Sequence, residues 1–577
     1  MKNVGSRILF LHSISLALLV FLLALFISFW GTAGYAVTFA VTNTNDSGEG
    51  SLRAAINSAN SYDDLISFDV TGTITLNSQL EISGDKGMKI QGPGAELLAV
   101  SGNDACRVFY IATTASVDIS GISIVSGSAD MGGGMYNYRS NPIITNCIFS
   151  SNTACNDIHA TGGGMLNRDS SPIVTNCTFS ENSSSVYGGG MGNDSGSRPT
   201  VTNCIFNSNS ALHGGGICNW YLYTSPFTNC TFSSNTAHSG GGMYNFESLP
   251  ELTTCTFSEN TATQKGGGMY NSVSSPDVTN CTFNGNNAND YGGGIYNYSS
   301  DSAVTNCTFF ENHAENHGGG ICNYESTFHV SDCTFDTNSA DYGGGMFNDF
   351  APSSSVTAST VIQGNTFTGN IGVNKGGAIY NEYAKTVEII NCTLILNSAE
   401  YGGGIYSYSS SPIITNCTLT GNTANSGVSM YSKESEPVVR NCIFWEDDGV
   451  EVVNSLSSPD IAFCVVENQI TGVTDISDII TADPMLETLD DNGGPTWTCA
   501  LGRGSSAIDE GTDEGDVPVT DQRGIERPQG TGYDIGAYEH EPGTDDYNDS
   551  GGCNISSLPA VGFLLLMPLM FLSGKRK

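Results

Sequence analysis

Positively charged residues are scarce in this sequence. Only 20 of its 577 residues are Lys or Arg, against 58 Asp and Glu, and the formal net charge is −38. Because five of the basic residues lie in the two terminal segments, residues 37–550 hold 15 basic and 58 acidic side chains. A field of this sign argues against nucleic acid as a partner and against docking on anionic lipid. It suits a solvated extracellular surface, where the acidity serves solubility or, alternatively, binds Ca²⁺.

Motifs for metal ions and phosphate are also lacking. No two of the 18 cysteines have C-x-x-C spacing, which excludes the usual zinc and iron–sulfur patterns. None of the glycine-rich stretches has the G-x-x-x-x-G-K-[ST] pattern that cradles phosphate. Tandem G-G-x-G-x-D-x-U-x nonapeptides, which build calcium β-rolls, do not occur either. We therefore expect no cofactor, with Ca²⁺ the only ion that the acidic charge leaves open.

The N-terminus has the pattern of an export signal. Lys2 and Arg7 precede an apolar run over residues 8–30, and small residues follow up to Ala36. This order is typical of a secretory signal peptide, so we expect residues 1–36 to be removed by cleavage after Ala36. The length of the apolar run leaves an uncleaved membrane anchor as the alternative.

Residues 546–577 form a second terminal signal, with Gly551, Gly552 and Cys553 ahead of an apolar segment at 558–572 and three final basic residues. A 15-residue helix spans only about 22 Å, short of a bilayer core of about 30 Å. The segment resembles bacterial C-terminal sorting tails, some of which carry a Gly-Gly-Cys element. That resemblance implies cutting and transfer to the cell surface, with Gly551, Gly552 and Cys553 as the processing or lipid-attachment site. A plain tail anchor in the cell envelope is the alternative.

A unit of about 26 residues occurs eleven times between Met131 and Tyr406. One copy runs from GGGIYN at residues 292–297 to TNCTFFEN at 305–312. Self-similarity at such a period marks a solenoid, in which each repeat contacts only its neighbours. The units contain short β-branched and aromatic runs between turn residues, and no helical period. Three short strands per unit predict an all-β fold: a right-handed parallel β-helix of about 15 coils.

The fixed positions of the repeat have structural explanations. In residues 174–179, Cys177 and Phe179 share one face of a strand, and Val174 joins that face only if Asn176 bends in the left-handed conformation. The triple glycines suit tight corners. The asparagine that follows them predicts a ladder of stacked amides: Asn137, Asn167, Asn193, Asn219, Asn245, Asn271, Asn297, Asn323, Asn348 and Asn381.

Cysteine recurs at one position of the repeat, at Cys147, Cys177, Cys204, Cys230, Cys255, Cys281, Cys307, Cys333, Cys392, Cys417 and Cys442, while one coil has Asn365 there. Stacked strands leave equivalent Cβ atoms about 4.8 Å apart, whereas disulfides prefer about 3.8 Å. We therefore expect a ladder of buried free thiols rather than disulfides.

The residue before the glycines varies, in order Met131, Thr161, Tyr187, His213, Ser239, Lys265, Tyr291, His317, Tyr342, Lys375 and Tyr401. Variation in residue type indicates an exposed position. The aromatic members are Tyr187, His213, Tyr291, His317, Tyr342 and Tyr401, and they form a candidate edge for contact with sugar rings or a partner protein. A turn position that accepts any residue type is the alternative.

The pairing of Gly-Gly-Gly/Ala-[Ile/Met] with Phe-x-x-Asn, as in residues 179–182 and 206–209, resembles the polymorphic outer membrane protein repeat over residues 130–425. That family forms β-helical passenger domains that are displayed on bacterial surfaces and linked to adhesion. The resemblance therefore implies a cell-surface or outer-membrane location and an adhesive role. The alternating strands of the family's autotransporter barrel do not follow in this sequence.

The flanks of the repeats resemble other modules. Residues 46–56 resemble a short element that opens many exported β-helix proteins, so we expect an N-terminal cap at 37–72 and the β-helix at 73–465. Four motifs, at 491–496, 506–509, 520–524 and 534–539, resemble the choice-of-anchor Q domain, which we place at 466–545. We expect this domain to be a small β-rich cap that seals the last coil.

These features predict an exported, surface-anchored β-helix protein with a structural or adhesin-like role and no catalysis. Its expected partners are the cell envelope, through the tail, and host or matrix protein or polysaccharide. The alternative is a β-helix polysaccharide lyase or glycoside hydrolase, for which Asp290, Asp341 and Glu400, each beside a Tyr-Gly-Gly-Gly, come closest to a catalytic set. A Ca²⁺-dependent binding module is a third possibility.

Overall fold

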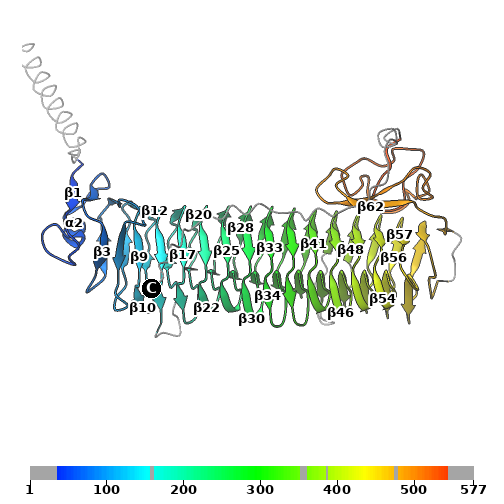
Figure 1. Ribbon diagram of the computed structural model, residues 1–577, viewed down its shortest axis with the longest axis horizontal. Coiled ribbons are helices and arrows are strands. Elements are labelled where there is room, and N and C mark those ends of the chain that lie inside the picture. The colour runs from blue at the N-terminus through cyan, green and yellow to red at the C-terminus, as the bar shows by residue number, and fades with distance from the viewer. Residues whose placement is uncertain (1–35, 156–160, 351–359, 385–386, 474–477, 543–577) are drawn as a thin grey trace, which may run out of the picture. The chain divides into compact units, whose positions relative to one another are not determined.

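A computed structural model describes residues 36–155, 161–350, 360–384, 387–473 and 478–542 (Figure 1). The described residues up to His540 belong to one compact unit. The expected signal peptide at 1–36, except for Ala36 itself, lies outside the described residues, as does the expected tail at 546–577 with Gly551, Gly552 and Cys553. Within the described ranges, no helix is long and apolar enough to cross a membrane.

The repeats form a parallel β-helix, as the spacing predicts. One coil runs through β35 (Ile295–Tyr298), β36 (Ser302–Thr305), β37 (Thr308–Phe310) and β38 (His313–Ala314), and each strand pairs in parallel with its equivalent in the next coil. We call the resulting sheets C, A, B and D in that chain order. Over the described residues, sheet A has 17 strands and sheet C has 15, one per coil, which agrees with about 15 coils.

Sheet D was not predicted, because the sequence led us to expect only three strands per coil. In the described part of the chain it contains 12 strands, most of them short, in the polar stretch before the glycine corner. Its first members are β10 (Ser128–Ala129), β14 (Thr153–Ala154) and β18 (Ser183–Ser184). These pairs lack an apolar run because only a small residue such as Ala154 has to be buried there, so hydrophobic patterning does not reveal them.

Sheet C carries the glycine-led strands and the candidate edge. Its repeat strands are β11 (Met135–Tyr138), β15 (Met165–Arg168), β19 (Met191–Asp194), β23 (Ile217–Trp220), β27 (Met243–Phe246), β31 (Met269–Ser272), β35, β39 (Ile321–Tyr324), β43 (Met346–Asp349), β47 (Ile379–Glu382), β51 (Ile405–Tyr408) and β55 (Met430–Lys433). Each begins after a glycine with positive φ. At Gly292, where φ is 66°, a Cβ atom would lie 2.5 Å from the Ile295 carbonyl oxygen, so only glycine fits this corner.

The interior consists of stacked columns of identical side chains. The rings of Phe149 and Phe179 stack with centroids 4.6 Å apart, and this column continues coil by coil to Phe367. The cysteine column is buried beside it, which confirms its expected position, and Cys464 extends it by one coil. All of these thiols are free. Asn365 replaces a cysteine but keeps its contacts, because its Oδ1 accepts from the Cys333 amide and its Nδ2 donates to the Val330 carbonyl.

The bend between sheets A and B confirms the left-handed asparagine. Asn176 has φ of 52°, and the equivalent Asn203 and Asn229 have 53° and 51°. Each side chain bonds to the preceding one: Asn203 donates to Asn176 at 3.1 Å and Asn229 donates to Asn203 at 2.8 Å. The bend therefore has its own exposed amide ladder.

Two further amide ladders are buried. The expected ladder runs from Asn137 to Asn381, with each Nδ2 2.7–2.9 Å from the next Oδ1. The second consists of the asparagines of the Phe-x-x-Asn motif. Asn286, for example, donates to Asn312 and to the Phe257 carbonyl, and accepts from the backbone and side chain of Asn260. Both ladders satisfy polar groups that would otherwise be unpaired inside the coils.

The short helix α2 (Leu52–Ser58) lies against the first coils, in the segment where the N-terminal cap is expected. Ser51 is its N-cap and accepts from the Ala54 amide. Leu52 and Ile56 are buried in the core, while Arg53 donates to the Gln79 carbonyl and pairs with Asp46. The diverged opening motif thus supplies a cap residue, two core residues and a tether.

The C-terminal segment, with β62 (Leu486–Asp490) and β63 (Thr498–Leu501), does not lie only at the end of the coils as expected. It packs on the outer face of sheet B, where Thr393 donates to Gln522 and Thr418 accepts from the Ala537 amide. Two asparagines of the bend between sheets A and B also contact the C-terminal segment, because Asn391 and Asn441 donate to backbone carbonyls of that segment. Outward hydroxyls and amides on successive coils therefore hold it against the side of the stack.

Candidate functional site

The outer face of sheet C carries three columns of side chains. In each strand the first and third residues point inward, so the second and fourth point outward. The second residues, which we call the inner column, are Tyr136, Leu166, Gly192, Cys218, Tyr244, Tyr270, Tyr296, Cys322, Phe347, Tyr380, Tyr406 and Tyr431. The fourth residues, the outer column, include Arg168, Asp194, Trp220, Phe246, Tyr298 and Tyr324. The edge column is the variable position before the glycines.

The structure stacks the predicted edge residues in two groups. The rings of Tyr187 and His213 lie 5.5 Å apart between centroids. Tyr291, His317 and Tyr342 follow one another in three consecutive coils, at 5.1 and 5.0 Å. Their backbones pair in parallel from coil to coil, so the register of the edge is as the sequence predicts. Whether this edge contacts a ligand stays a prediction.

Tyr401 lies apart from these groups, because Lys375 separates it in register from Tyr342. All six predicted edge rings are half-buried rather than fully exposed, since they pack against the inner column. Burial lowers the pKa of His317 to about 4 and also lowers the pKa of His213. Both imidazoles are therefore neutral at pH 7, and the positive charge near the edge comes from lysines.

The inner column was not anticipated from the sequence. Tyr270 and Tyr296 lie 5.0 Å apart between ring centroids, as do Tyr380 and Tyr406. Lys375 Nζ lies 5.0 Å from the Tyr406 ring, within cation–π range. The signal was present in the repeat, because the Tyr of Gly-Gly-Gly-Ile-Tyr-Asn alternates with inward Ile and Asn and so points outward.

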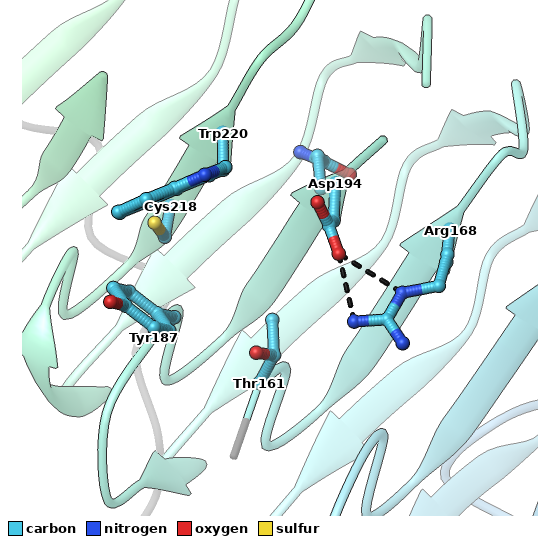
Figure 2. Close-up of a pocket in the computed structure, with 7 residues that line it drawn as sticks. Thr161, Arg168, Tyr187, Asp194, Cys218 and Trp220 are labelled. Carbon is cyan, nitrogen blue, oxygen red and sulfur yellow. Dashed lines mark hydrogen bonds and ion pairs between the residues drawn. The ribbon is translucent and has the colours of Figure 1, made fainter. Parts of the chain in front are cut away.

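The inner column is interrupted at two consecutive coils, by Gly192 and Cys218. A hollow of about 250 Å³ lies at this gap, lined by Thr161, Arg168, Tyr187, Asp194, Cys218 and Trp220. Figure 2 shows the two aromatic rings on one side of it and the Arg168–Asp194 ion pair on the other. The ring centroids of Tyr187 and Trp220 are 4.9 Å apart at 63°. Both Nε and Nη2 of Arg168 contact Oδ2 of Asp194, at 3.0 and 2.8 Å.

The carboxylates considered for catalysis are not brought together. Asp290 accepts from Asn316 Nδ2 at 2.7 Å, and Asn316 lies one coil further on. Asp341 is two coils beyond Asp290, which places them on the order of 10 Å apart at the strand spacing. Glu400 is two coils further again. Because each of these carboxylates lies two coils from the next, they do not form a pair of catalytic carboxylates.

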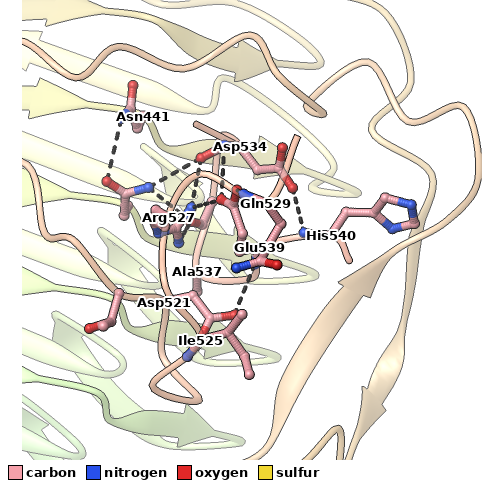
Figure 3. Close-up of polar contacts among 12 residues, drawn as sticks. Asn441, Asp521, Ile525, Arg527, Gln529, Asp534, Ala537, Glu539 and His540 are labelled. Atoms are coloured by element: carbon pink, nitrogen blue, oxygen red, sulfur yellow. Dashed lines mark hydrogen bonds and ion pairs between the residues drawn. The ribbon is translucent and has the colours of Figure 1, made fainter. Parts of the chain in front are cut away.

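A second set of charged residues is buried in the C-terminal segment (Figure 3). Arg527 Nη1 lies 2.9 Å from Glu539 Oε2, and both side chains are fully buried. Asp521 Oδ1 accepts from the Arg523 and Ile525 amides and so closes its own turn. Burial raises the pKa of Asp534 to about 6. The motifs at 520–524 and 534–539 supply Asp521, Arg523, Asp534 and Glu539, while Ile525 and Arg527 lie between the two motifs. The contacts of these residues hold the segment's backbone in place.

Within the described ranges, no three His, Cys, Asp or Glu side chains are placed to hold a metal ion. Ca²⁺ binding therefore stays an untested prediction, as does processing at Gly551, Gly552 and Cys553.

The right handed beta helix region family model matches residues 77–248, 223–373 and 351–475. The chain belongs to this family. No curated protein matches the chain. This β-helix protein is similar to the ORF18 protein of Geobacillus virus E2, at 14% identity and a TM-score of 0.35 over 50% of this chain and 62% of that one.

Two enzymes are also similar in structure. A PL6 family polysaccharide lyase from Pseudopedobacter saltans has 12% identity and a TM-score of 0.35, over 63% of this chain and 85% of that one. A GH87 alpha-1,3-glucanase from Streptomyces thermodiastaticus has 12% identity and a TM-score of 0.30, over 78% and 71%. At these identities the likeness concerns the fold and says nothing about activity.

Proposed function

We propose that this β-helix protein is exported and displayed on the bacterial surface, where it has a structural or adhesin-like role without catalysis. The observation that carries the proposal is the outer face of sheet C. Its edge column presents half-buried aromatic rings in runs of two and three consecutive coils, packed over the buried inner column, and aromatic surfaces are enriched where proteins bind partners. The partner is a host or matrix protein or a polysaccharide.

The contrast between buried, constant positions and outward, variable positions of the repeat supports this proposal. The Phe, Cys and Asn columns are buried and occupied with one another, so they explain why the coils stack. Side chains on sheet C differ between coils mainly where they point outward. A protein selected only for stacking has no need of rings at those positions, since small or charged residues would keep the coil soluble.

Display on the surface rests on the ends of the chain. The export signal at 1–36, the polymorphic outer membrane protein resemblance, the choice-of-anchor Q resemblance and the tail at 546–577 all point to the cell envelope. Protease treatment of whole cells, compared with cells that express the chain without residues 551–577, tests this. We expect digestion of the intact chain on cells and its loss to the medium without the tail. Continued display without the tail would contradict the anchoring.

Adhesion and catalysis need separate tests. A strain that lacks the chain should adhere less to host matrix or polysaccharide surfaces than its parent, and equal adhesion would refute the role. The absence of catalysis is tested by incubating the purified protein with acidic and neutral polysaccharides and measuring new reducing ends. Turnover that the Asp341→Ala variant abolishes would replace our proposal with the lyase or hydrolase alternative.

A further inference from the structure

Gly192 and Cys218 interrupt the aromatic inner column in two consecutive coils of sheet C, whereas Cys322 interrupts it in a single coil. Tyr244 follows Cys218 in register, and Leu166 precedes Gly192. A Tyr at position 218, as at 244, would fill the space that the hollow occupies. Two small residues in consecutive coils therefore open a recess of about 250 Å³ on this face.

The walls of this recess combine apolar faces with one polar pair. Tyr187 stacks on His213 and Trp220 stacks on Phe246, at 5.5 and 4.5 Å between centroids, so both rings are held from behind by the next coil. The face of an aromatic ring is electron-rich and attracts weakly positive C–H bonds laid against it. Such a wall suits a ring that presents C–H groups on one face and polar groups around its rim.

The opposite wall determines the charge of the ligand. The Arg168 guanidinium is neutralised by Asp194, and both guanidinium contacts go to Oδ2. Neither contact uses Oδ1 of Asp194, so this oxygen can accept a hydrogen bond from a hydroxyl. A cationic ligand would meet Arg168, and an anionic ligand would meet Asp194. The pair therefore favours a neutral, hydroxyl-rich ring.

We propose that this recess is a subsite for one neutral pyranose ring, which stacks on Trp220 and Tyr187 and donates a hydroxyl hydrogen bond to Asp194. The subsite deepens the proposed function, on which it rests, by giving the aromatic face a ligand class. Its volume lies below the range of about 300–1,000 Å³ for drug-sized ligands, so it holds one ring. Longer glycans would extend along the edge column from there.

Saturation-transfer NMR on the exported full chain tests the subsite. The probes are methyl glucopyranoside, methyl galactopyranoside and methyl mannopyranoside as neutral rings, glucuronate as an anion and choline as a cation. We expect saturation transfer to at least one methyl glycoside and to neither charged probe. Preferential transfer to glucuronate or choline, or to no probe, would overturn the proposal.

Two variants locate the binding. Cys218→Tyr fills the recess with the residue of the adjacent coil, and Cys322→Tyr makes the same change at the other inner-column cysteine, away from the recess. Cys218→Tyr should raise the Kd of the glycoside at least about tenfold, and Cys322→Tyr should leave it unchanged. Equal effects of the two variants would refute the location. Trp220→Ala gives a second check, because it should weaken binding without filling the recess, and circular dichroism verifies folding of all three.

The outcome for the subsite is separable from that for the proposed function. If no glycoside binds but the strain that lacks the chain adheres poorly, the subsite is refuted and the adhesive role stands. If that strain adheres as well as its parent while the glycoside binds at Cys218, the adhesive role is refuted and the subsite stands.

Discussion

The buried amide ladder of the Phe-x-x-Asn motif makes a quantitative prediction at Asn286. Its Oδ1 accepts from the Asn260 amide at 3.1 Å, and its Nδ2 donates to Asn312 and to the Phe257 carbonyl at 2.9 Å. In Asn286→Ala the Asn260 amide loses this acceptor and stays buried. An orphaned buried group costs about 1–3 kcal/mol, and the remaining lost bonds bring the expected destabilisation to about 2–4 kcal/mol.

The matched control is Asn284→Ala, two residues away in the same coil. Asn284 lies on the outer face of sheet B, so its replacement should change stability by less than about 0.5 kcal/mol. Guanidinium unfolding followed by circular dichroism compares both variants with the parent, and hydrogen exchange of the Asn260 amide reports the local effect. If both substitutions destabilise the protein equally, or neither does, the ladder does not stabilise the coils as we infer.

Three other predictions concern the ends and the core. Burial raises the pKa of the Cys417 thiol well above its usual value, so iodoacetamide should leave it unmodified in the native protein and label it fully in guanidinium; native labelling would contradict the thiol ladder. Burial likewise raises the pKa values of Asp447 and Glu451, so the folded chain binds protons more tightly than the unfolded one, and stability should fall as pH rises from about 4 through the folded pKa values. Asp447→Asn should flatten that fall in melting curves at pH 5 and pH 9, and an unchanged slope would refute the assignment. Gln522→Ala removes the acceptor of the buried Thr393 hydroxyl, so limited proteolysis should cut the C-terminal segment before the coils; simultaneous loss of both would contradict separate docking.

The predicted pH dependence arises at the end of the buried amide ladder of the Phe-x-x-Asn motif. Asn422 is its last asparagine, and its amide donates to Asp447 Oδ1 instead of to another amide. The Ser429 hydroxyl donates its one hydrogen to Asp447, and its oxygen also lies within hydrogen-bond distance of Glu451 Oε2. Ionisation of both carboxyls in one buried site is energetically unfavourable, so the pair retains one proton. An asparagine at position 447 would avoid that conflict, which is why the substitution should help most at high pH.

Features that one repeat unit determines by itself could be predicted from the sequence. The bend at Asn176 follows from the phase of Val174 against Cys177, and the stacking of Cys, Phe and Asn follows because each coil places the same residue at the same site. Those predictions needed only strand geometry and the period. The fold class and the approximate number of coils followed from the same reasoning.

Other features depend on contacts that the period does not contain. Sheet D consists of pairs such as Thr153–Ala154 that carry no hydrophobic pattern. The C-terminal segment docks through pairs 129 residues apart, such as Thr393 with Gln522, and a single sequence gives no sign of which face they meet on. The recess exists because Gly192 and Cys218 depart from the repeat in adjacent coils, and only their register shows that both departures open the same space.

The central functional claim is that the outer face of sheet C binds the partner, and adhesion by complemented cells tests it most directly. One strain would carry Tyr291→Ala, His317→Ala and Tyr342→Ala on the edge column. The control strain would carry Glu251→Ala, Asp277→Ala and His329→Ala on the outer face of sheet A, with surface amounts of both proteins matched by immunoblot. We predict that the edge variant loses adhesion while the sheet A variant keeps it. Full adhesion by the edge variant would contradict the account.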